Sequence, residues 1–111
     1  MSARARFAYV QVRLQARHGA RPDEALWRSL QGTSDFANYL QLARHTPLQS
    51  WVRTLDPGQS SDEIEAELRR LFRHHVDEVA GWVPPAWRPA VVWVRRLPDL
   101  PALQHLLSGE P

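Results

Sequence analysis

The 111-residue chain contains no cysteine, and its only basic side chains besides histidine are arginines, since it has no lysine. The absence of cysteine excludes disulfide bonds, thiolate metal sites and a cysteine nucleophile. Small secreted domains usually depend on disulfides, so we expect a cytoplasmic protein. No apolar run approaches the ~20 residues that a membrane-spanning helix needs, so we expect no membrane span.

Glycine is scarce, and the motifs that hold cofactors or reacting groups are missing. The five glycines are dispersed, and neither a phosphate-binding loop nor a nucleophile elbow occurs. The histidines form no His-Glu-x-x-His or Glu-x-x-His pattern, and the adjacent His74 and His75 would diverge by about 100° on a helix. We therefore predict no catalytic residue, no cofactor and no metal site. A small helical enzyme that uses His74 or His75 with a carboxylate is an alternative.

The charges are nearly balanced but are separated along the chain. The chain has 14 arginines and 12 acidic residues, a net charge of +2, so nucleic acid is not the partner we expect. Five arginines precede the first acid, Asp23, and an acidic stretch follows at residues 56–67. This separation favours a protein partner or a homo-oligomer. Solvated helix faces, a targeting or membrane-surface segment, and a nucleic-acid accessory role for the first helix are the alternatives.

The spacing of apolar residues predicts an all-α, compact single domain over residues 1–111, with about six to seven helices. Pro22 is expected as a first helical residue, and Ser34, Thr46 and Ser60 as N-caps. Ser60 and Glu63 also have the spacing of a capping box. Residues 90–94 fit a strand as well, but a lone strand would lack a pairing partner. The expected helices are 3–18, 22–32, 34–45, 47–55, 61–81, 89–96 and a short one after Pro101.

The chain has five tryptophans, three of which surround a bend expected at Pro84 and Pro85. Tryptophan and arginine together are typical of protein interfaces and of platforms that stack single-stranded nucleic acid. The same residues also occur as a core with a charged rim. From the first helix and the bend we select six candidate partner-binding residues: Arg6, Arg13, Arg17, Trp82, Trp87 and Arg88.

Several motifs resemble the V-type ATPase C/d family, and together they span nearly the whole chain. They begin with Tyr9-Val-Gln-Val-Arg13 and continue with Ser60…Glu63-Ile64-Glu65…Leu68-Arg69 and the prolines at 84 and 85. Near the end of the sequence the match continues with Asp99-Leu100…Leu103…Leu106-Leu107. Leu30, Phe36, Tyr39, Leu40 and Thr46 also match.

The resemblance implies a single helical lobe of a family built from three such lobes. Members of that family form a socket between the rotating central stalk and the membrane ring, without catalytic residues or cofactors. One lobe cannot form that socket, so the chain would be either a diverged single-lobe relative or a self-assembling one. The resemblance thus predicts a non-catalytic assembly subunit whose partners are rotary ATPase subunits.

Overall fold

The computed structural model describes residues 2–109, and every regular element among them is helical. The prediction of an all-α protein is therefore confirmed, and the strand considered for residues 90–94 is wrong. None of the described helices is both long and apolar enough to cross a membrane.

The chain divides into two units. We name them the α5–α7 unit, residues 2–10 and 69–109, and the α2–α4 unit, residues 11–68. Both boundaries fall inside continuous helices, namely α1 (Ala3–Gly19) and α5 (Ser61–Trp82). A single domain over residues 1–111 stays a prediction.

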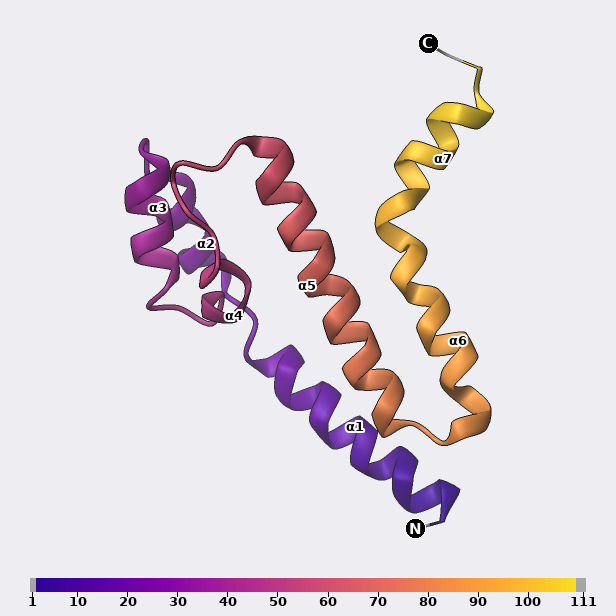
Figure 1. Ribbon diagram of the computed structural model, residues 1–111. Coiled ribbons are helices and arrows are strands. Elements are labelled where there is room, and N and C mark those ends of the chain that lie inside the picture. The colour runs from indigo at the N-terminus through magenta and orange to yellow at the C-terminus, as the bar shows by residue number, and fades with distance from the viewer. Residues whose placement is uncertain (1, 110–111) are drawn as a thin grey trace. The chain divides into compact units, whose positions relative to one another are not determined.

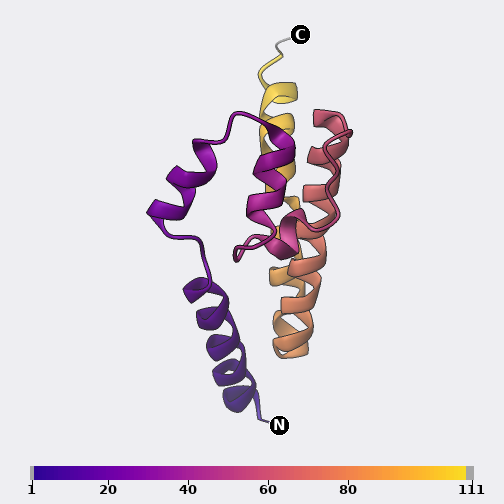
Figure 2. The same cartoon turned by 90° about the vertical axis from the view of Figure 1, so that its left-hand side faces the viewer.

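The α2–α4 unit contains α2 (Glu24–Gln31), α3 (Phe36–Ala43) and α4 (Gln49–Val52). In Figure 2, α3 and α4 lie next to the first turns of α5. Ile64 and Leu68 of α5 pack against the core of this unit. The buried core residues are Leu30, Leu40, Ala43, Val52 and Leu55.

Aspartates cap two of these helices. Asp23 accepts a hydrogen bond from the Leu26 amide at 2.8 Å, and Asp35 accepts one from the Ala37 amide at 3.2 Å. Pro22 is therefore not the first residue of α2, and Ser34 is not the cap of α3, contrary to both predictions, because a neighbouring aspartate satisfies the free amides.

The predictions for the N-termini of α4 and α5 have different outcomes. The Thr46 hydroxyl accepts from the Leu48 amide at 3.1 Å, but it closes a turn and α4 begins only at Gln49. The Ser60 hydroxyl accepts from the Glu63 amide at 3.2 Å, so the cap of α5 is confirmed.

In the α5–α7 unit the chain turns back after Trp82. It passes through the 3₁₀-helix η1 (Pro85–Trp87), α6 (Arg88–Trp93), the 3₁₀-helix η2 (Val94–Asp99) and α7 (Leu100–Leu107). Figure 1 shows α6 running antiparallel to the end of α5. Two ion pairs link these segments, Arg95–Asp77 at 3.4 Å and Arg69–Asp99 at 3.8 Å.

Candidate partner-binding surface

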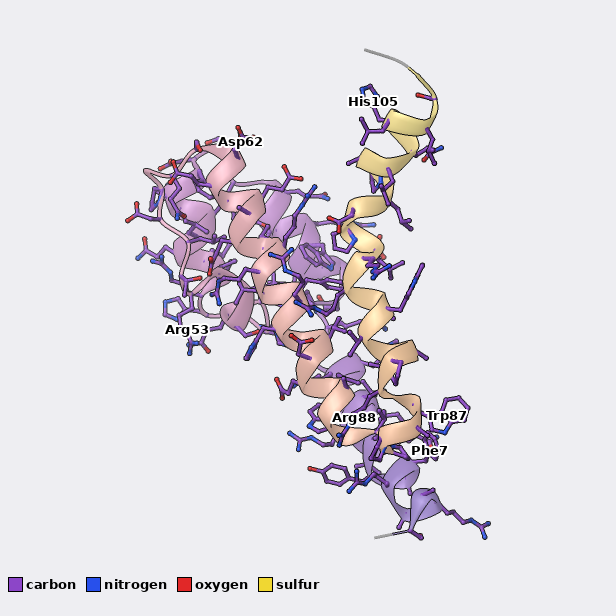
Figure 3. The ribbon with its side chains drawn as sticks, turned by 45° about the vertical axis from the view of Figure 1, so that its right-hand side comes forward. Phe7, Arg53, Asp62, Trp87, Arg88 and His105 are labelled. Carbon is purple, nitrogen blue, oxygen red and sulfur yellow. The ribbon has the colours of Figure 1, made fainter. Side chains whose placement is uncertain are left out.

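Phe7 and Trp87 form an aromatic pair at the turn after α5. Their ring centroids are 5.5 Å apart and the ring planes meet at 81°, an edge-to-face arrangement that the ring quadrupoles favour. Figure 3 shows the two side chains beside each other, with Trp87 on the outer side of the turn. Trp87 remains 56% exposed and Phe7 39% exposed. The pair therefore orients a large aromatic surface without burying it.

One backbone and one side-chain hydrogen bond hold the turn that carries Trp87. Pro84 and Pro85 restrict the backbone at the turn, and the Trp87 amide donates to the Pro84 carbonyl at 2.9 Å. The Arg88 Nε donates to the Ala80 carbonyl of α5 at 3.1 Å. Arg88 therefore fixes the turn that presents Trp87, whereas it was selected from the sequence as a partner contact. Trp82 is half-buried and has an interaction within the chain.

The arginine face of α1 is less available than the sequence suggests. Arg6, Arg13 and Arg17 share one side of the helix, since they are seven and four residues apart. Arg13 and Arg17 already have interactions within the chain, and Arg17 is half-buried. These two belong to the α2–α4 unit, whereas Arg6 belongs to the α5–α7 unit.

The burial pattern of the α5–α7 unit is unusual. Apart from Pro84, its buried residues are all small apolar ones: Val10, Val76, Ala80 and Val83. Several of its larger apolar side chains are exposed: Trp93 is 52% exposed, Leu106 73% and Leu107 88%. Isolated exposed apolar residues are ordinary, but a contiguous set of them marks an interaction site.

We name this set the α6–α7 strip, and sequence analysis did not select it as a site. Its members are Trp93, Leu97, Leu100, Leu103, Leu106 and Leu107, all exposed. The four leucines of α7 fall within a 120° arc of the helix at 100° per residue. The spacing was visible in the sequence. It predicts an apolar face, but such a face is usually buried against the rest of the protein.

An apolar hollow lies between α5 and the segment that follows the turn. We name it the α5–α6 hollow. It has a volume of about 230 Å³. Its lining residues are His75, Val76, Val79, Val91 and Val94. Arg95 and Asp77, which pair at 3.4 Å, directly follow Val94 and Val76 in the chain. The hollow thus has an apolar lining with a charged pair beside it.

The two units differ in charge. With histidine neutral, the described α5–α7 unit has eight arginines and three acids, a net charge of +5. The α2–α4 unit has six arginines and eight acids, a net charge of −2. The exposed aromatic and leucine side chains of the α5–α7 unit therefore belong to the positively charged unit of the chain.

The histidines were the other candidates for chemistry. The rings of His74 and His75 are 6.3 Å apart between centroids and inclined by 68°. Among residues 2–109, no group of three histidine or acidic side chains is arranged to hold a metal ion.

Comparison with known proteins finds no matching family model, no similar curated protein and no similar solved structure.

Proposed function

We propose that this chain is a non-catalytic helical subunit that binds another protein through its α5–α7 unit. The observation that carries the proposal is the exposure of Trp87 and Trp93 in a unit whose buried residues are small. Tryptophan contributes more binding energy at protein interfaces than most residues, because it buries a large rigid surface at low entropic cost. The ordered turn around Trp87 supports the same proposal, because a preorganised side chain loses less entropy on binding.

A more specific form of the proposal makes the chain an assembly subunit of rotary ATPase machinery in the cytoplasm. Its support is the sequence resemblance to the V-type ATPase C/d family and the lack of cysteine. This more specific proposal includes self-association of the chain, because a single lobe needs further copies to build a socket.

The experiment is affinity capture of the tagged chain from its native cells, with quantitative mass spectrometry. The test variant replaces both exposed tryptophans of the α5–α7 unit, Trp87→Ser with Trp93→Ser. The matched control is Trp27→Ser, which removes an exposed tryptophan from the α2–α4 unit. We expect the double variant to capture at least about tenfold less of the specific partners than the parent chain does. This loss corresponds to roughly 1.4 kcal/mol of binding free energy.

The control should retain the partners, and circular dichroism should show that both variants keep the helix content of the parent chain. Rotary ATPase subunits among the lost partners would support the specific form. An identical partner set from the parent chain and the double variant would contradict the proposed function.

A further inference from the structure

The α5–α6 hollow has the size and chemistry of a pocket for one apolar side chain. Valine and histidine side chains line it, and it is an open depression of about 230 Å³, a volume above the ~150 Å³ of an enclosed apolar cavity that holds benzene. A pocket of this kind recognises a protruding side chain at a fixed position. A fluid lipid surface offers no such fixed side chain, so the hollow favours a structured partner.

The α6–α7 strip extends the apolar surface along the chain that leaves the hollow. Val94 lines the hollow, and Leu97, Leu100 and Leu103 follow it at intervals of three residues. An amphipathic helix presents its own apolar residues at intervals of three and four, which matches this arrangement. The regular spacing of these residues therefore suits a partner helix that packs along η2 and α7.

Charge gives the second property of the partner. The α5–α7 unit carries a net charge of +5, and Arg96 is exposed in η2, directly before Leu97 of the strip in the chain. Asp77 and Asp99 pair with Arg95 and Arg69, and outside these two pairs the unit has six arginines and one acid. This excess of arginines attracts acidic side chains and repels basic ones.

We propose that the α5–α6 hollow and the α6–α7 strip bind an acidic amphipathic helix of another protein. One leucine-sized side chain of that helix enters the hollow, its further apolar residues cover the strip, and its carboxylates face Arg96. This inference rests on the proposed function, and it adds the class of partner and the site.

The test uses the full chain and a synthetic peptide of about 20 residues, which spans roughly 30 Å as a helix. The peptide has leucines on one face, glutamates on the other and a fluorescein label. One control peptide replaces each glutamate with lysine, and another replaces each leucine with alanine. Fluorescence anisotropy should show binding of the leucine–glutamate peptide, at least about tenfold tighter than either control.

Two variants of the chain locate the site. Arg96→Glu reverses an exposed charge beside the strip, and we expect it to weaken binding of the leucine–glutamate peptide several-fold, with a smaller salt dependence. Val91→Glu places a carboxylate in the hollow and should abolish binding. Arg53→Glu in the α2–α4 unit is the matched control, because Arg53 is also exposed, and it should bind as the parent chain does.

Equal binding of the lysine and glutamate peptides would overturn the inference. So would unchanged binding by Arg96→Glu and Val91→Glu. Tighter binding to vesicles with about one-third phosphatidylserine, or to single-stranded DNA, would identify a different class of partner and would also overturn it. If capture from cells still depends on Trp87 and Trp93 while the peptide fails to bind, only the acidic-helix inference fails and the proposed function stands.

Discussion

The ring of Phe7 meets the indole of Trp87 edge to face, with centroids 5.5 Å apart, although the two residues are 80 positions apart in the sequence. The contact joins the start of α1 to the turn after α5 within one unit. Because Trp87 stays more than half exposed, this contact orients the indole while leaving most of it free to bind.

The Phe7–Trp87 contact should contribute to stability. Phe7→Ala removes the edge-to-face pair and the covered part of the Phe7 ring, and we expect it to lower the free energy of unfolding by about 1–2 kcal/mol. Urea denaturation followed by circular dichroism measures the change. Val12→Ala, at an exposed position of the same helix, should stay within about 0.5 kcal/mol of the parent chain. Equal values for the two variants would show that the aromatic contact does not stabilise the fold.

Buried and exposed leucines should respond differently to truncation. Leu40→Ala removes a side chain that is only 1% exposed, and the expected loss is about 2–5 kcal/mol in the free energy of unfolding. Leu106→Ala makes the same chemical change in the α6–α7 strip and should cost under about 0.5 kcal/mol, because little area is uncovered. A loss of several kcal/mol at Leu106, measured by the same urea titration, would mean that the fold itself requires the strip.

The cap of α3 can be assigned by a pair of adjacent substitutions. Asp35→Ala removes the acceptor of the Ala37 amide and should destabilise the protein by about 1 kcal/mol, within the range of roughly 0.5–2 for lost caps. Ser34→Ala should change the thermal midpoint much less, because Asp35 remains as the cap. A larger effect at Ser34 would show that Ser34, and not Asp35, is the cap of α3.

Arg44 should stabilise the α2–α4 unit through one hydrogen bond. Its Nη2 donates to the Leu55 carbonyl at 2.8 Å in a partly buried position, connecting the end of α3 with the segment after α4. Arg44→Ala should cost about 1.5–3 kcal/mol, the range for hydrogen bonds to charged groups. Arg53→Ala is the matched control at an exposed arginine and should be nearly neutral. Thermal unfolding should separate the two variants, and equal midpoints would contradict the role given to Arg44.

Local signals in the sequence were sufficient to predict the all-α class and the limits of α5. Ser60 and Glu63 mark the start of α5, and the helical spacing of its apolar residues marks its length. Both signals depend on residues close together in the sequence, so they can be interpreted without the tertiary structure. The cap of α3 could not be assigned because Ser34 and Asp35 are adjacent and both are good caps. Pro98 lacks an amide hydrogen for an α-helical bond, and the helix predicted for 89–96 instead becomes 3₁₀ from Val94.

The candidate surface was only partly predictable. Trp87 was selected because prolines and arginines lie near it in the sequence. Its exposure and its contact with Phe7, however, depend on the tertiary structure. For the same reason, the interactions that Arg13 and Arg17 make within the chain could not be inferred from their spacing. An apolar helix face such as that of α7 predicts burial, and only the fold shows that it is exposed.

The most direct test of the central claim is hydroxyl-radical footprinting of the tryptophans in the isolated chain and in the complex captured from cells. In the isolated chain, Trp87 and Trp93 should oxidise readily, as should Trp27, because all three are exposed. In the complex, Trp87 and Trp93 should be protected several-fold while Trp27 is unchanged, since a partner excludes solvent from the residues that it covers. Equal oxidation of Trp87 and Trp93 in both states would contradict a partner-binding role for the α5–α7 unit.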